Sequence, residues 1–80
     1  MRIPRDLSGA DLIKRLERLG YVVTRQTGSH VRLTSSLHGE HHVTIPNHDP
    51  LRVGTLAAIL TMVATHHGIT RDALLQRLFD

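Results

Sequence analysis

The sequence predicts an α+β domain in the order α-β-β-β-α, followed by a short extra helix at the C-terminus. Apolar residues recur with helical spacing over residues 7–20 and 54–68. Between them, residues 21–46 hold three β-prone runs joined by short connections, which favours an antiparallel meander. Two amphipathic helices can cover one face of such a three-stranded sheet and leave the other face open.

The composition places the chain among small globular domains. Its 80 residues are 40% hydrophobic and are expected to form a single domain over residues 1–80. The chain has no cysteine, which excludes a disulfide framework and a thiolate metal site. No apolar run approaches the ~20 residues of a membrane span, and no signal-peptide pattern opens the chain, so we expect a cytoplasmic protein without a membrane partner.

The charge balance is compatible with an anionic partner but does not favour one over a surface that serves solubility. Ten Lys and Arg against seven Asp and Glu give a formal net charge of +3, and seven histidines add positive charge below about pH 6.5. Basic domains of this size often bind polyanions. A basic surface that serves only solubility would have the same composition.

The first helix has clear start and stop signals. Ser8 can cap its free N–H groups, Asp11 lies in the positive first turn, and Gly20 ends it. Its predicted buried stripe is Leu12, Ile13, Leu16 and Leu19.

Three strands are predicted over residues 21–27, 31–35 and 41–45, and Pro46 ends the third. Gly28 supplies the first turn, and Gly39 supplies the turn of the loop over residues 36–40. In the first strand, Tyr21 and Val23 are expected to face inward, with Thr24 and Gln26 on the polar face. The inward residues of the other strands are expected to be Val31, Leu33, Val43 and Ile45.

Two helices follow the strands. The second is expected to begin near Gly54, with Thr55 as a possible cap, and to end at Gly68; its buried stripe is predicted to be Leu56, Ile59, Leu60 and Val63. Thr70 is expected to cap the last helix, over residues 71–79. Its apolar residues either pack on the core or form an exposed partner surface; they are Leu74, Leu75, Leu78 and Phe79.

The open face of the predicted sheet carries the chemistry. His30, Arg32 and Thr34 alternate with apolar residues and share that face, and His42 and Thr44 join them from the third strand. A neutral imidazole can take a proton from a ribose 2′-OH, which then attacks the adjacent phosphate, while nearby cations stabilise the transition state. On spacing alone, His30 is better explained as a polar residue at the start of a strand than as a catalytic group.

Other chemistry has less support. His41 and His42 are strand neighbours that face opposite ways, and His66 and His67 lie about 100° apart around a helix without a carboxylate at ligand spacing, so no metal site is expected. Ser29 as a nucleophile would need an orienting base and a carboxylate behind it, and the sheet region offers only Glu40.

Several motifs occur together over roughly residues 7–69. They are Gly20-Tyr21 after a helix, Arg25-Gln26-x-Gly28-Ser29-His30, a third strand closing as Val43-x-Ile45-Pro46, and Gly54-Thr55-Leu56-x-x-Ile59-Leu60. Together they resemble the HicA family of toxin ribonucleases. The resemblance implies a double-stranded-RNA-binding-like fold, mRNA cleavage that inhibits translation, and neutralisation by a HicB-type antitoxin in a toxin–antitoxin complex. It also implies that His30 is catalytic and that Gly28 and Ser29 form the turn that positions it. Two features depart from the family pattern: the chain continues through residues 70–80, and it uses arginine where many members use lysine.

The sequence therefore predicts an mRNA interferase, a toxin endoribonuclease that uses His30 and needs no metal or other cofactor. Arg25 and Arg32 are the predicted phosphate contacts, with Ser29 and His42 as further RNA-binding residues. A non-catalytic RNA-binding module of the same fold and a protein-interaction domain remain the alternatives.

Overall fold

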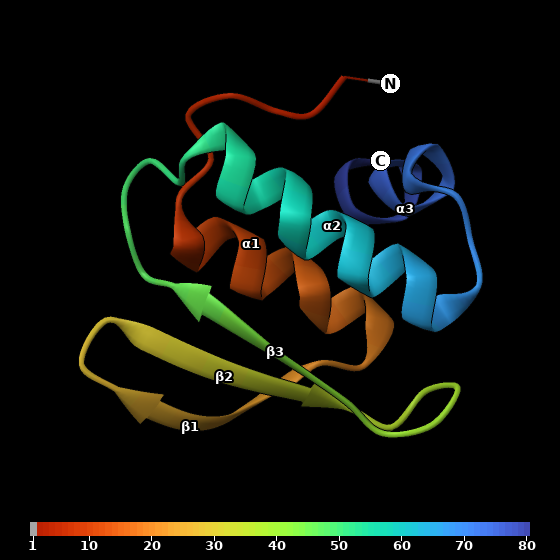
Figure 1. Ribbon diagram of the computed structural model, residues 1–80, viewed down its shortest axis with the longest axis horizontal. Helices are drawn as coiled ribbons and strands as arrows, with labels where there is room; N and C mark the ends of the chain where they lie inside the picture. The colour runs from red at the N-terminus through yellow and green to blue at the C-terminus, as the bar shows by residue number, and fades with distance from the viewer. Residues whose placement is uncertain (1) are drawn as a thin grey trace.

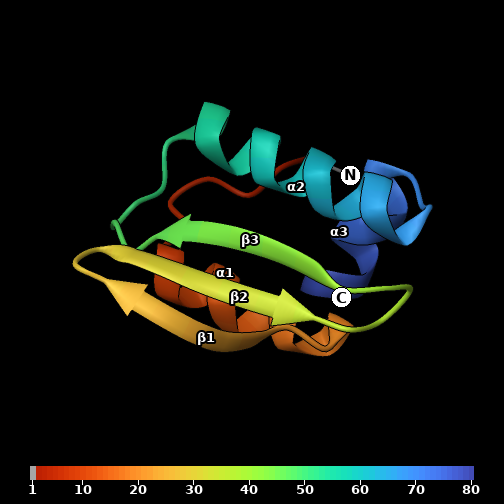
Figure 2. The same cartoon turned by 60° about the horizontal axis from the view of Figure 1, so that its bottom comes forward.

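The computed structural model describes residues 2–80 and has the predicted element order (Figure 1). The elements are α1 (Gly9–Leu16), the 3-10 helix η1 (Glu17–Leu19), β1 (Val22–Thr27), β2 (His30–Ser35), β3 (His41–Pro46), α2 (Val53–His67) and α3 (Arg71–Phe79). The strands form one antiparallel sheet in the order β1-β2-β3. Figure 2 shows the helices on one side of this sheet and none on the other, which confirms the predicted α+β architecture.

The start of α1 is fixed by its own sequence. The Ser8 hydroxyl accepts a hydrogen bond from the Asp11 N–H (3.0 Å), and the Asp11 carboxylate accepts one from the Ser8 N–H (3.3 Å). At the other end the helix tightens into η1, and Gly20 then turns the chain with a φ of 78°. The predicted cap and stop are both confirmed, although the last turn is a 3-10 helix.

Gly9 brings α1 against the end of β3. A Cβ at this position would collide with the carbonyl oxygen of Pro46. The Gly9 N–H also donates a 2.8 Å hydrogen bond to the carbonyl of His48, just beyond β3. Glycine thus allows the helix to approach the end of the sheet where the first hairpin turns.

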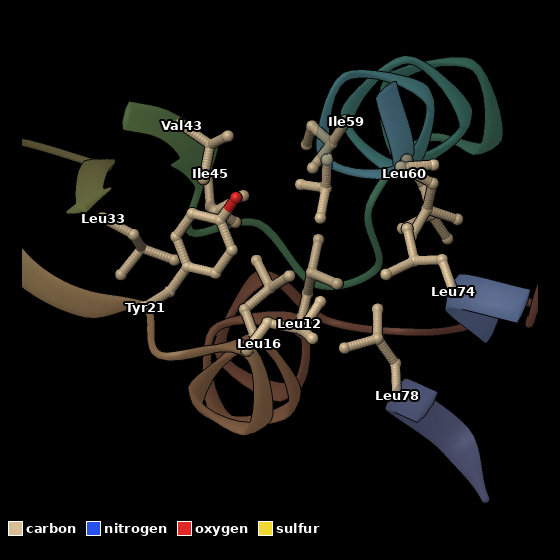
Figure 3. Close-up of a cluster of buried hydrophobic side chains, with 14 of the residues drawn as sticks. Leu12, Leu16, Tyr21, Leu33, Val43, Ile45, Ile59, Leu60, Leu74 and Leu78 are labelled. Atoms are coloured by element: carbon tan, nitrogen blue, oxygen red, sulfur yellow. The ribbon is translucent and has the colours of Figure 1, made fainter. Parts of the chain in front are cut away.

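The core lies between the sheet and the helices. Figure 3 shows leucine, isoleucine and valine side chains from α1, the sheet, α2 and α3 gathered in one cluster, with Tyr21 on its sheet side near Leu33 and Ile45. Leu74, Leu75 and Leu78 of α3 are 0%, 1% and 0% exposed. The packing interpretation of α3 is confirmed, and the alternative of an exposed leucine surface is wrong.

The start of α2 differs from the prediction. The helix begins at Val53, its N-cap is Arg52, and no side chain caps it, so Thr55 is not the capping residue. Thr55 lies inside the first turn, where its hydroxyl cannot reach the free N–H groups as an N-cap residue does. The predicted end at Gly68 is confirmed, and so is the Thr70 cap of α3, whose hydroxyl accepts from the Ala73 N–H (3.1 Å).

Within residues 2–80, no single helix is long and apolar enough to cross a membrane. The pair α2 and α3 meets those length and composition criteria only when joined across a bend of 102°.

Candidate nucleic-acid interface

We call the uncovered side of the sheet the open face. Along β2, buried and exposed residues alternate as predicted, so that Val31, Leu33 and Ser35 face the helices while His30, Arg32 and Thr34 face outward. In β3, the buried Val43 and Ile45 alternate with the exposed His42 and Thr44. The register pairs Arg32 with Thr44 and Thr34 with His42, which places the outward residues of the two strands side by side.

A bulge in β1 decides which of its residues share the open face. The register between β1 and β2 shifts at Thr24, so that Arg25 lies opposite Arg32 and Gln26 lies opposite the buried Val31. The prediction that Thr24 and Gln26 share the polar face is therefore wrong for Gln26. The extra residue moves Arg25 onto the open face, where uninterrupted alternation would have turned it away.

Val23 also departs from the prediction of an inward side chain. It pairs with the buried Leu33, yet it is 52% exposed, and all of β1 is exposed. Figure 1 shows β1 at the edge of the sheet farthest from α2, so the helices do not cover it. Tyr21, just before the strand, is 1% exposed as predicted.

The turn before His30 is a tight two-residue connection. Thr27 pairs with His30, which leaves Gly28 and Ser29 as the turn residues. Gly28 has a φ of 57° and Ser29 does not share the positive φ, which is the pattern of a type II′ hairpin turn. The Ser29 carbonyl also accepts a hydrogen bond from the Asn47 N–H (2.6 Å), so the turn is held to the chain that follows β3.

His30 extends from this anchored turn into solvent. Its side chain is exposed, and the structure gives its ring no hydrogen-bond partner within residues 2–80. Arg32 lies two residues along the same strand face, about 7 Å away by strand geometry. The ring is thus accessible to a ligand, and a cationic side chain stands beside it.

Arg25 and Arg32 form a pair of facing cations. As cross-strand partners they place their Cβ atoms about 5 Å apart, where like charges destabilise a sheet. Within residues 2–80, neither guanidinium group has an ion pair. A phosphate group between them would convert this repulsion into two charge-assisted contacts.

Sequence reasoning missed a row of polar contacts that crosses the open face. The Thr24 and Thr34 hydroxyls are 2.9 Å apart, the Thr34 hydroxyl is 2.8 Å from Nδ1 of His42, and Nε2 of His42 is 3.5 Å from the Glu40 carboxylate. We call Thr24, Thr34, His42 and Glu40 the polar row. The sequence showed that both threonines are polar residues of predicted strands. It did not show the bulge in β1, which brings their side chains together on the open face.

His30 and His42 stand at opposite ends of the sheet. His30 pairs with Pro46 and His42 pairs with Thr34, which is four residues, or roughly 13 Å, along β2 from His30. The two imidazoles therefore cannot act on one phosphodiester bond. His42 can contact only a more distant part of a ligand that spans the open face.

Two shallow hollows lie away from this face. One, of about 640 Å³, follows α1, and another, of about 490 Å³, lies between the N-terminal segment and the starts of α2 and α3. Neither is lined by a predicted site residue. An exposed sheet face with outward cations suits an extended polyanion better than a small molecule, which prefers a concave pocket.

The histidines do not form a ligand set in the part of the chain that the structure describes. No group of three or more His, Cys, Asp or Glu in residues 2–80 is placed to hold a metal ion. His41 and His42 face opposite sides of the sheet, as predicted: His41 contacts Tyr21 beneath the sheet and His42 belongs to the polar row.

Comparison with known proteins identifies a family for this chain. No curated protein and no solved structure matches this chain. The family described as the HicA toxin of bacterial toxin–antitoxin systems matches residues 9–64, which run from the first residue of α1 into the last turns of α2. That range includes the bulged strand, the hairpin turn and the whole open face, and it covers most of the sequence. The chain therefore belongs to the HicA family of bacterial toxins.

Proposed function

We propose that this toxin is an endoribonuclease that cleaves mRNA, with His30 as its catalytic residue. The observation that carries the proposal is the exposed His30 ring on an anchored turn, next to the unpaired cations Arg25 and Arg32. Family membership supports the toxin role, and the exposed cationic face suits a nucleic-acid backbone.

The proposed chemistry uses the RNA's own hydroxyl group. His30 takes the proton from a ribose 2′-OH, the 2′ oxygen attacks the adjacent phosphorus, and the bond to the 5′ oxygen breaks. A second group or water donates a proton to that leaving oxygen. The products are a 2′,3′-cyclic phosphate and a 5′-OH, and no metal ion is needed for any step. A positioned histidine is typically worth about 10²–10⁴-fold in rate.

The remaining site residues bind rather than react. Arg25 and Arg32 hold the phosphate that carries the developing charge, and Ser29 contacts the RNA from the hairpin turn. His42 binds RNA several residues away, where the polar row orients its ring. The toxin acts on mRNA in the cytoplasm, and a HicB-type antitoxin neutralises it.

The test is cleavage of RNA by the purified chain in the presence of EDTA. The native chain is expected to cut, His30→Ala to lose at least about 100-fold in rate, and the control His48→Ala to retain full activity. His48 is an exposed histidine of the β3–α2 connection, so its replacement removes the same type of side chain from outside the strands. Equal cleavage by native chain and His30→Ala would refute the role of His30. Retarded but intact RNA would instead assign the chain to non-catalytic RNA-binding modules.

A further inference from the structure

Four of the seven histidines gather at the end of the molecule opposite the His30 turn. His38 lies in the loop between β2 and β3, His41 begins β3, and His66 and His67 end α2. The His41 and His66 rings stack with centroids 4.2 Å apart, His67 meets His66 edge-on at 4.8 Å, and His38 meets His67 edge-on at 5.6 Å. We call these residues the four-histidine cluster.

Tyr21 connects two of these rings beneath the sheet. Its buried hydroxyl is 2.7 Å from Nδ1 of His41 and 3.0 Å from Nε2 of His67. A hydroxyl has one proton, so it donates to one ring nitrogen and accepts from an N–H of the other. If both imidazoles were protonated, both nitrogens would donate, and the hydroxyl proton would lose its acceptor in a buried site.

His66 fastens the loop between β2 and β3 onto α2. Its Nε2 lies 3.1 Å from the carbonyl oxygens of both Leu37 and Gly39, so this nitrogen carries the proton and donates to them. The loop thus depends on α2 for its position, while His41 at its far end depends on the same cluster.

The surroundings of the cluster oppose positive charge. Burial, and then the neighbouring His66 and His42, lower the pKa of His41 below its ordinary value. Burial also lowers the pKa of His67. The further causes are neighbouring groups that can carry positive charge: His66 on the same helix, and His38, His41 and Arg77 of α3 from other parts of the chain. The nearby carboxylate, Glu40, lies against His42 on the opposite face of the sheet.

We propose that the four-histidine cluster is a pH-sensitive latch, which holds the β2–β3 loop and the start of β3 on α2 while His41 and His67 are neutral. Protonation of these two rings breaks their shared contact with the Tyr21 hydroxyl and frees this end of the sheet. Because Glu40 and His42 flank His41 in sequence, opening the latch also displaces the end of the polar row. The device acts on the fold and is independent of whether the toxin cleaves RNA.

The direction of the effect follows from the lowered pKa values. Rings that the fold keeps neutral bind fewer protons than the same rings in the unfolded chain, so stability is complete above the unfolded pKa of about 6.5. It falls as the pH drops below that value, by up to tenfold in the folding equilibrium per pH unit for each such ring.

The test compares urea unfolding at pH 7.5 and pH 5.0. We expect the folding equilibrium constant of the native chain to fall at least about tenfold between these values, and that of His48→Gln, the control, to fall equally. The triple variant His41→Asn, His66→Gln, His67→Gln keeps amide groups where the ring nitrogens were and cannot be protonated. Its folding equilibrium constant is expected to fall between the two pH values by a factor less than a third as large as that of the native chain.

A second measurement on the native chain covers the case in which the triple variant does not fold. Amide exchange, corrected for its intrinsic pH dependence, is expected to speed up at pH 5.0 over residues 36–42 more than over the hairpin of β1 and β2. Equal pH dependence of the native and triple-variant stabilities would overturn the latch. Uniform loss of exchange protection across the sheet would overturn it as well.

Discussion

At the scale of single residues, the open face is defined by side chains that lack partners inside the fold. The His30 ring has no hydrogen bond within residues 2–80, and Arg25 faces Arg32 without an intervening carboxylate. His42, in contrast, is held by Thr34 and Glu40. These unpaired groups lie near the hairpin turn, and they are the ones that an anionic ligand would stabilise.

The arginine pair predicts a specific change in RNA binding. Arg25→Gln and Arg32→Gln should each weaken binding and lower the slope of log K against log salt by about 0.7, because each removes one phosphate contact to a single strand. Binding is measured with His30→Ala as the background, so that the RNA stays intact.

Lys14→Gln serves as the matched control, since it removes the same unit charge from an exposed position on α1. Its salt slope should match that of the background chain. If all three variants shifted the slope equally, net charge rather than the facing pair would explain the binding.

At the scale of elements, the turn before β2 positions His30. Gly28 has a positive φ, and no atom lies within 4 Å of where its Cβ would be. A side chain at this position strains the backbone but collides with no neighbouring atom. The loss in unfolding free energy on substitution therefore reports the backbone conformation of the turn alone.

Gly28→Ala should therefore lower the free energy of unfolding by about 1–2 kcal/mol, and Gly28→Asn by less, because asparagine tolerates a positive φ better than alanine does. Urea unfolding at pH 7.5 measures both values. If alanine and asparagine cost the same, the positive φ would not be what this position requires.

Much of this architecture could be predicted from local signals. The Ser8 cap, the Gly28 turn and the alternation through β2 depend on neighbouring residues, and all three are confirmed. The bulge at Thr24 could not be predicted, because residues 24–26 have the composition of a regular strand. Only the pairing with β2 shows that β1 has one extra residue. The same limit applies to Val23, whose exposure depends on how far the helices extend over the sheet.

The candidate site was predictable in its residues but not in its arrangement. His30 and Arg32 follow from strand alternation, whereas the separation of His30 from His42 depends on the register between β2 and β3. The four-histidine cluster joins residues 38 to 67, and no local pattern in the sequence brings such distant rings together.

At the scale of the whole molecule, α3 belongs to the core although it lies beyond the range matched by the family. The match ends at residue 64, and α3 spans Arg71–Phe79. Arg15 and Arg18 of the N-terminal helical segment donate hydrogen bonds to carbonyls at the end of α3, at 3.2 Å to Leu78 and 2.9 Å to Asp80. The C-terminal helix thus closes the core against α1.

Leu78→Ala should then cost about 2–5 kcal/mol of unfolding free energy, because it opens a cavity at a fully buried side chain. Gln76→Ala, at an exposed position of the same helix, should change stability by less than about 0.5 kcal/mol. A Leu78→Ala chain as stable as the native one would mean that α3 is an appendage rather than part of the core.

The most direct test of the proposed activity is the chemistry of the RNA ends that the purified chain produces. A substrate with a 2′-deoxy sugar at the cleavage position serves as the comparison, since it lacks the proposed nucleophile. We predict a 2′,3′-cyclic phosphate and a 5′-OH from RNA, and no cleavage at the deoxy position. Products with a 5′-phosphate and a 3′-OH, or cutting at the deoxy position, would contradict proton abstraction from the 2′-OH by His30.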